Sequence, residues 1–257
     1  MNVFGAYADY YDILYRDKDY AAEAADVLRR VRALAPGAER ILELGCGTGL
    51  HALEMARLGA RITGVDISEP MLEQARRRLA PLGGELKSRL RFRQADARDC
   101  RLGEQFDAVA ALFHVVSYQT SEADLTAVFA TAAAHLARGG PFLFDFWYGP
   151  AVLAQRPTVR SKRFQKDGVQ LVRLAEPTLH EREECVDVSY SLWTGGGREA
   201  GGRELLRETH RLRYLFVPAL EAALARAGLQ LVSVTADDSD LPPSSETWSA
   251  FAAARKT

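Results

Sequence analysis

Three glycines alternate with other residues directly after a short apolar segment. Gly45, Gly47 and Gly49 follow residues 40–44, and a helix-forming segment comes next. Glycines at a strand-to-helix turn let the backbone approach a ligand closely. A dinucleotide-binding loop needs its third glycine three residues after the second, but Leu50 occupies that position. The spacing therefore predicts a loop for a cofactor other than NAD or a flavin nucleotide. A tight turn with a structural role alone is the alternative interpretation.

Further candidate binding residues follow other short apolar segments. Asp66 and Asp96 each come after one such segment, and Leu112 and Phe113 end another. In open α/β sheets, ligands bind at the carboxyl ends of strands, and a carboxylate at the end of the second strand binds ribose hydroxyls. We therefore interpret Asp66 as a ribose ligand, Asp96 as a second polar anchor and Leu112 as an apolar adenine contact. A helix N-cap or a surface carboxylate is the alternative for Asp66.

His114 and Tyr118 follow the same apolar segment as Leu112. They are four residues apart, so a helical turn would place both in one pocket. Either side chain could take a proton from an acceptor amine or hydroxyl. A histidine satisfied inside the core is the alternative for His114. For the N-terminal tyrosines, including Tyr11, we weigh an active-site role against a helix packing stripe.

The elements that position these residues alternate between strand and helix. Apolar runs predict strands over 40–44, 61–65, 90–94, 106–113, 141–146, 229–235 and 247–254. Helical periodicity predicts helices over 19–35, 51–58, 70–79, 122–136 and 218–227, with Ser68 as a cap of the third. This alternation predicts an α/β fold with a doubly wound parallel sheet.

Residues 158–216 interrupt that pattern with a period closer to two. We predict an inserted antiparallel sheet there, with a glycine-rich turn over 195–202, and a cofactor domain formed by 1–157 and 217–257. The alternation places Glu208 and His210 on one face and Arg211 and Arg213 on the other. Such a face could meet a phosphate or carboxylate, and a solvated surface is the alternative.

The ordered motifs resemble those of class I S-adenosylmethionine-dependent methyltransferases. They are Ile41-Leu42-Glu43-Leu44-Gly45-Cys46-Gly47-Thr48-Gly49, Gly64-Val65-Asp66-Ile67-Ser68, Met71-Leu72 and Ala95-Asp96-Ala97. The resemblance implies a Rossmann-like, seven-stranded sheet and S-adenosylmethionine as cofactor, with S-adenosylhomocysteine as product. It implies that the glycine loop holds the methionyl group and that Asp66 binds both ribose hydroxyls. It also places Ile67 and Leu112 against the adenine, with Asp96 accepting from its amino group; Glu43, Met71 and Ala97 belong to the same motifs.

A narrower resemblance links the chain to methyltransferases that modify amino-sugar nucleotides. It rests on Tyr10-Tyr11-Asp12, Lys18-Asp19-Tyr20, the segment 113–118 and Phe146-Trp147-Tyr148. It implies that Tyr11 caps the active site and that Tyr20 contacts the cofactor. That group often has a serine where His114 stands and a histidine or tyrosine where Tyr118 stands, so the identity of a catalytic base stays open.

Composition narrows the class of acceptor. The 257 residues carry a net charge of −1, which disfavours a non-specific nucleic-acid binder. Three cysteines without CxxC spacing predict neither a disulfide framework nor a metal site, and they favour the cytoplasm. We find no segment with the length of a membrane span or the pattern of a signal peptide. We expect transfer to nitrogen or oxygen of a small molecule. The alternatives are a tRNA or protein methyltransferase and a non-catalytic regulatory module. The two faces of the inserted sheet also suggest a homodimer.

Overall fold

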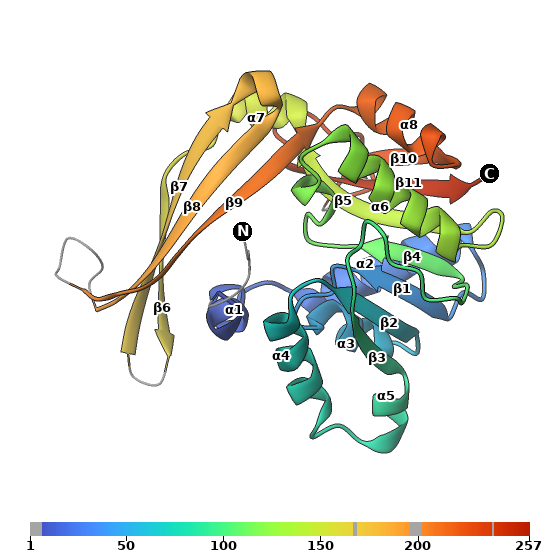
Figure 1. Ribbon diagram of the computed structural model, residues 1–257, viewed down its shortest axis with the longest axis horizontal. Coiled ribbons are helices and arrows are strands. Elements are labelled where there is room, and N and C mark those ends of the chain that lie inside the picture. The colour runs from blue at the N-terminus through green and yellow to red at the C-terminus, as the bar shows by residue number, and fades with distance from the viewer. Residues whose placement is uncertain (1–6, 167–168, 196–201, 238) are drawn as a thin grey trace.

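One twisted sheet runs through the molecule (Figure 1). The computed structural model describes residues 7–166, 169–195, 202–237 and 239–257, and eleven strands within them belong to this sheet. Its parallel part has the order β3-β2-β1-β4-β5. The bounds are β1 (Arg40–Leu44), β2 (Arg61–Asp66), β3 (Leu90–Gln94), β4 (Ala108–Ala111) and β5 (Pro141–Tyr148). Two antiparallel strands extend it, β11 (Ser249–Lys256) beside β5 and then β10 (Leu229–Ala236).

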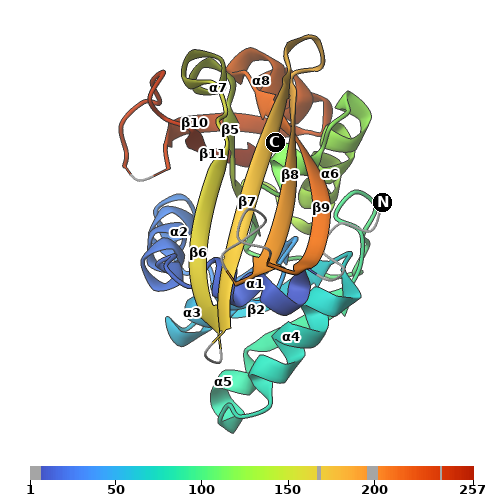
Figure 2. The same cartoon turned by 90° about the vertical axis from the view of Figure 1, so that its left-hand side faces the viewer.

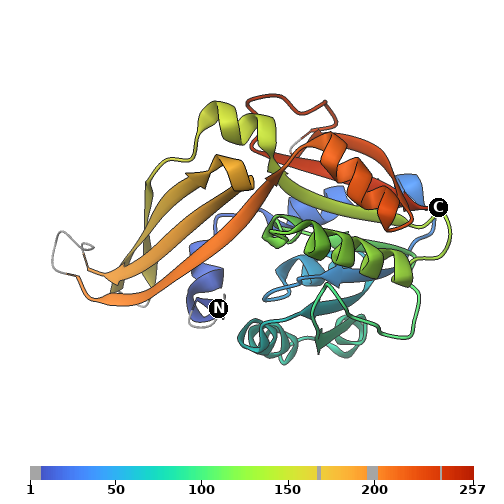
Figure 3. The ribbon, with the colours of Figure 1, turned by 45° about the horizontal axis from the view of Figure 1, so that its top comes forward.

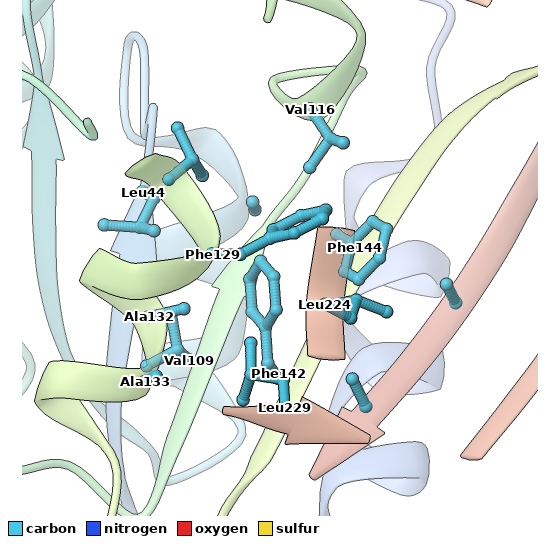
Figure 4. Close-up of a cluster of buried hydrophobic side chains, with 14 of the residues drawn as sticks. Leu44, Val109, Val116, Phe129, Ala132, Ala133, Phe142, Phe144, Leu224 and Leu229 are labelled. Carbon is cyan, nitrogen blue, oxygen red and sulfur yellow. The ribbon is translucent and has the colours of Figure 1, made fainter. Parts of the chain in front are cut away.

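Helices cover both faces of the parallel part. The bounds are α1 (Ala8–Leu14), α2 (Tyr20–Leu34), α3 (Leu50–Arg57), α4 (Glu69–Leu79), α5 (Gly84–Ser88), α6 (Glu122–His135), α7 (Gly149–Gln155) and α8 (Val217–Arg226). Side chains of α2 and α3 pack in one core cluster, and those of α6 and α8 pack in another. In the second cluster, the ring of Phe129 on α6 lies 5.8 Å from that of Phe142 and 5.4 Å from that of Phe144 on β5 (Figure 4). Aromatic pairs at such distances stabilise a core beyond their buried area.

The predicted α/β sheet is confirmed, with small differences at the ends of its elements. β1 to β5, β10 and β11 are its seven strands within the described residues. Ser68 accepts a hydrogen bond from the backbone N–H of Met71, as expected of the cap of α4. The predicted strand 106–113 is too long, since β4 covers only Ala108–Ala111. It ends early because Phe113 and His114 have left-handed backbone angles, with φ of 64° and 68°, which no strand accommodates.

The segment predicted as an inserted antiparallel sheet forms four strands: β6 (Arg160–Lys166), β7 (Val169–His180), β8 (Cys185–Thr194) and β9 (Glu204–Leu215). Within the predicted glycine-rich turn, residues 196–201 lie outside the described residues. β9 continues into the main sheet, because Tyr214 and Leu215 pair with Trp147 and Tyr148 at the end of β5. The inserted sheet therefore extends from the carboxyl end of the parallel strands (Figure 3).

Helix α1 lies between the inserted sheet and the α/β core. Figure 2 shows it crossing the lower part of the four strands. Tyr7 and Leu14 from this segment are buried against Phe164, Leu192 and other apolar residues of the inserted sheet. Asp12 on α1 accepts a hydrogen bond from the hydroxyl of Thr48 and pairs with Arg78 of α4. The helix is thus tied to both parts of the molecule.

Two further properties concern the described chain as a whole. Its described helices include none that is long and apolar enough to cross a membrane. Cys46, Cys100 and Cys185 are all buried free thiols.

Candidate active site

A cavity of about 440 Å³ opens at the carboxyl ends of the parallel strands, where the strand order reverses between β1 and β4. Doubly wound folds bind their ligands at such a switch point. The cavity is lined by most of the residues predicted from the sequence: Tyr11, Tyr20, Gly45, Gly47, Asp66, Ile67, Met71, Asp96, Ala97, Leu112, His114 and Tyr118. Glu43 and Gly49, which the same prediction included, are not among its lining residues.

The three glycines of the loop differ in the space that a side chain would find at each position. All have left-handed φ angles, between 54° and 74°. A Cβ on Gly45 would lie 2.4 Å from Val115, and one on Gly49 would lie 2.6 Å from Phe92, so packing excludes any larger residue at both. A Cβ on Gly47 would meet nothing within 4 Å. Gly47 is therefore the position where the loop leaves room for a ligand.

Asp66 connects the end of β2 to that loop. Its two carboxylate oxygens accept backbone N–H groups, one from Gly47 and one from Ser68, each at 2.8 Å. Burial raises the pKa of Asp66, and these hydrogen bonds act in the opposite direction. Each carboxylate oxygen can accept more than one hydrogen bond, so the group retains capacity for hydroxyl donors.

Asp96 is held by Arg98, a residue that sequence analysis did not single out. The Arg98 guanidinium donates to both carboxylate oxygens of Asp96 and also pairs with Asp124. These hydrogen bonds lower the pKa of Asp96, so it is an ionised acceptor at neutral pH. The side chain of Ile67, also at the cavity, is an unusually exposed apolar group at 59%. An acceptor beside an apolar surface suits a purine base with an exocyclic amine.

Glu43 lies beneath the loop and is 1% exposed. Burial, with a smaller contribution from the charge of Asp66, raises the pKa of Glu43 to about 8. The group is therefore mostly protonated at pH 7. Its Oε2 atom has no hydrogen-bond partner among the described residues. Tyr20, whose ring lies 4.8 Å from that of His51, likewise has a buried hydroxyl without a described partner. Tyr20 lines the cavity and therefore has hydrogen-bonding capacity left for a polar ligand.

At the other end of the cavity, His114 is fixed by Asp145. The Nδ1 atom of His114 lies 2.6 Å from Oδ2 of Asp145, and the same oxygen accepts the backbone N–H of His114 at 2.9 Å. Burial alone would raise the pKa of Asp145, but the adjacent His114 lowers it below its usual value. A carboxylate beside Nδ1 favours a proton on that nitrogen, which leaves Nε2 as the basic atom of the ring.

Tyr118 belongs to a second hydrogen-bonded chain. Its hydroxyl lies 2.7 Å from Nδ1 of His210, and Nε2 of His210 lies 3.5 Å from Oε2 of Glu208. Burial lowers the pKa of His210 to about 4 despite Glu208, so the ring is neutral at pH 7. With its proton on Nε2, the ring accepts from Tyr118. The lone pairs of the Tyr118 oxygen can then accept a hydrogen bond from an acceptor molecule.

His114 and Tyr118 do share one cavity, as their spacing predicts. A 3₁₀ turn over Val116–Tyr118 brings them together, and Ser117 anchors it by accepting the backbone N–H of Trp147. The other predicted pair, Arg211 and Arg213, already pairs with carboxylates: Arg211 with Glu183 and Asp187, and Arg213 with Glu122 and Glu184. The phosphate-binding interpretation of this pair therefore lacks support.

A second cavity, of about 630 Å³, adjoins the first. His51, Leu112, Phe113 and His114 line both. It lies beside α2 and the start of β11, and Asp145 also lines it. The residues after β4 therefore form a partition between two spaces.

Comparisons with known proteins agree with this geometry. Residues 41–140 match a family described as a methyltransferase domain. The chain is 31% identical over 227 residues to dTDP-3-amino-3,4,6-trideoxy-alpha-D-glucopyranose N,N-dimethyltransferase from Streptomyces venezuelae, covering 88% of this chain and 90% of that protein. The crystal structure of Streptomyces venezuelae DesVI has a TM-score of 0.78 and 27% identity, covering 98% of both chains. An S-adenosylmethionine-bound amino pentose methyltransferase from Micromonospora echinaspora has a TM-score of 0.76 and 29% identity, covering 98% of both chains.

The fold and the site define a methyltransferase of class I. The chain belongs to the S-adenosylmethionine-dependent methyltransferases and resembles those that act on amino-sugar nucleotides. It is an enzyme that transfers a methyl group from S-adenosylmethionine.

Proposed function

We propose that the chain methylates the amino group of a sugar nucleotide. The observation that carries the proposal is the similarity to an amino-sugar N,N-dimethyltransferase across 88% of the chain, including both the cofactor loop and the inserted sheet. The acceptor end of the cavity supports it. It holds two groups, His114 and Tyr118, that can accept hydrogen bonds from an amine.

The cofactor residues are assigned from their positions. When bound, S-adenosylmethionine supplies an electrophilic methyl group on a sulfonium ion. The loop around Gly45 and Gly47, with Tyr20, holds the methionyl end. Asp66 accepts hydrogen bonds from the ribose hydroxyls, and Asp96 accepts one from the base. Ile67 and Leu112 contact the base, and Met71 and Ala97 complete this end. Glu43, which is buried beside the loop, and Gly49, which packs the loop against Phe92, act indirectly by shaping it.

The acceptor residues chiefly orient a neutral amine. The Tyr118 oxygen accepts one N–H while its own proton stays on the bond to His210. Nε2 of His114 takes the proton that the amine loses after it is methylated. Alignment of the amine with the methyl group at about 3 Å is the larger contribution in an in-line displacement.

Aromatic rings enclose the reacting groups. Tyr11 on α1 closes the cavity, with its ring centroid 4.8 Å from that of Tyr15 and 6.4 Å from that of Phe113. Aromatic faces attract a sulfonium cation by roughly 0.5–2 kcal/mol. Tyr11 therefore contributes both a cap and a favourable electrostatic environment.

The proposal also covers the domain organisation, the class of acceptor and the cellular location. Residues 1–157 and 217–257 form the cofactor domain, and 158–216 form the acceptor region and a surface for a homodimer. A small-molecule acceptor, without nucleic acid, fits the net charge of −1. The three reduced thiols fit the cytoplasm.

The decisive experiment is a methyl-transfer assay with dTDP-3-amino-3,4,6-trideoxyglucose, the acceptor named for the Streptomyces venezuelae relative. Release of S-adenosylhomocysteine and a mass gain of one or two methyl groups on the sugar are expected. The control acceptor has a hydroxyl in place of the amine and should stay unmodified. Methylation of the control but not of the amine would overturn the assignment to nitrogen, and no release with any small amine would favour a macromolecular acceptor or a non-catalytic role.

A further inference from the structure

Arg173 on β7 is a cation embedded in an aromatic layer. Its guanidinium carbon lies 5.3 Å from the ring centroid of Tyr15 and 5.5 Å from that of Tyr190. Its Nη1 donates to the hydroxyl of Tyr7 at 3.4 Å. The buried side chains of Phe164 and Leu171 belong to the same layer, between α1 and the inserted sheet.

No carboxylate of the described residues lies within ion-pair distance of Arg173. Each of the other described arginines with comparable burial, such as Arg30 and Arg213, has at least one carboxylate partner. A partly buried cation without a counter-charge costs folding free energy, and an apolar residue would pack in this layer at lower cost. The aromatic rings and the Tyr7 hydroxyl offset part of this cost, and a negatively charged ligand would supply the missing counter-charge.

Arg173 is not itself a lining residue of the cavity, but its guanidinium lies next to two rings that are. Tyr15 and Tyr190, the two rings closest to the guanidinium, both line the cavity that holds His114 and Tyr118. Lys162 of β6 lies directly opposite Arg173 in the strand register. Lys162 and Arg16 share a single carboxylate, Asp17, at 2.8 Å and 3.6 Å. Arg173, Lys162 and Arg16 thus outnumber their one ion-pair carboxylate, Asp17, on this side of the inserted sheet.

We propose that Arg173, assisted by Lys162, binds the diphosphate of the acceptor nucleotide. The inference rests on the proposed function and names the part of the acceptor that the inserted sheet recognises. A diphosphate between a nucleoside and a sugar carries two negative charges, which the guanidinium and the ammonium group would attract. A guanidinium can donate to two phosphate oxygens at once, so it also fixes the orientation of the ligand.

The first test measures binding to the protein saturated with S-adenosylhomocysteine. The probes are dTDP and thymidine, titrated by calorimetry. The wild type should bind dTDP more tightly than thymidine. Arg173→Met keeps the aliphatic stem and should weaken dTDP binding about ten- to a hundredfold, with thymidine unaffected. Arg163→Met is the matched control, because Arg163 is an exposed neighbour that pairs with Val172 on the opposite face of the sheet.

Folding of the variants is checked by their affinity for S-adenosylhomocysteine, which should not change. Arg173→Lys keeps the charge but loses the two-pronged donor, so its affinity for dTDP should fall between those of the wild type and Arg173→Met. Equal binding of dTDP by wild type and Arg173→Met would overturn the inference. An equal loss in Arg163→Met would also overturn it, since the effect would then be one of general surface charge.

The second test separates this inference from the proposed function. If the wild type methylates the amino-sugar nucleotide and Arg173→Met does so with unchanged KM, the proposed function stands and the role of Arg173 fails. If no amino-sugar nucleotide is methylated but dTDP binding depends on Arg173, the anion site stands and the proposed acceptor is wrong.

Discussion

Asp66 has two tasks that a single substitution can measure. It accepts the backbone N–H of Gly47 through one oxygen and that of Ser68, the N-cap of α4, through the other. Asp66→Ala should weaken binding of S-adenosylhomocysteine by roughly 1.5–3 kcal/mol for each charged hydrogen bond lost. Calorimetric titration measures the effect, and Glu221→Ala, an exposed carboxylate on α8, is the control. Unchanged affinity in a folded Asp66→Ala variant would remove the ribose assignment.

In the function that we propose, Asp145 positions His114. Asp145→Asn should lower kcat about ten- to a hundredfold, at or below the lower end of the usual contribution of acid–base catalysis. Affinity for S-adenosylhomocysteine should stay nearly intact.

A double-mutant cycle distinguishes this role from a structural one. In a His114→Ala background, Asp145→Asn should have little further effect on kcat. Additive losses in kcat would show that Asp145 acts independently of His114.

Within the glycine loop, two positions with similar backbone angles make a matched pair. Gly45→Ala would add a Cβ 2.4 Å from Val115, whereas Gly47→Ala would add one in open space. Both have left-handed φ and share a strain of roughly 1 kcal/mol, but only Gly45→Ala adds a clash. Urea unfolding without ligand should show Gly45→Ala as the less stable by at least about 1 kcal/mol. The reverse order would contradict the packing of Val115 against the loop.

The elements with strong periodicity could be predicted from the sequence, and those without it could not. α5 has no buried residue, so it has no apolar stripe to reveal it. α7 begins with Gly149-Pro150, which is typical of a turn. The early end of β4 follows from the hydrogen bond between His114 and Asp145, 31 positions apart. An apolar run alone cannot indicate where such a distant contact interrupts it.

The residues of the candidate site also differ in whether the sequence could predict them. The residues that we propose for the cofactor lie in short local motifs, so the sequence could indicate that most of them line the cavity. Asp145 lies within an apolar strand, where a single acidic residue gives no sign of its partner. The pair of Tyr118 and His210 spans 92 positions, and Arg173 depends on the register of β6 against β7. Such contacts are created by tertiary packing, which leaves no periodic signal in the sequence.

For the molecule as a whole, Glu43 predicts a stability that depends on pH. Its pKa rises from 4.5 in the unfolded chain to about 8 in the fold, because it is buried. The stability of the protonated form is fully present below about pH 4.5 and is lost as the pH rises through about 8. Across that window, this group lowers the free energy of unfolding by about 1.4 kcal/mol per pH unit.

Glu43→Gln removes this ionisation. The free energy of unfolding, measured with urea from pH 5 to 8.5 without cofactor, should then fall less steeply with pH. The exposed Glu221→Gln variant should keep the slope of the wild type. Identical slopes in Glu43→Gln and the wild type would mean that Glu43 is ionised in the fold.

The three buried thiols lie in different parts of the molecule, so the rate at which each is alkylated reports on its own region. Cys46 lies in the glycine loop, Cys100 after β3 and Cys185 in β8. Alkylation requires a thiolate that the reagent can reach, and burial raises the pKa of Cys46 and Cys100. Labelling with iodoacetamide, followed by mass spectrometry, should therefore report how often each region opens. Saturation with S-adenosylhomocysteine should slow labelling of Cys46 more than that of Cys185; equal slowing would mean that the loop and the inserted sheet open together as one cooperative unit.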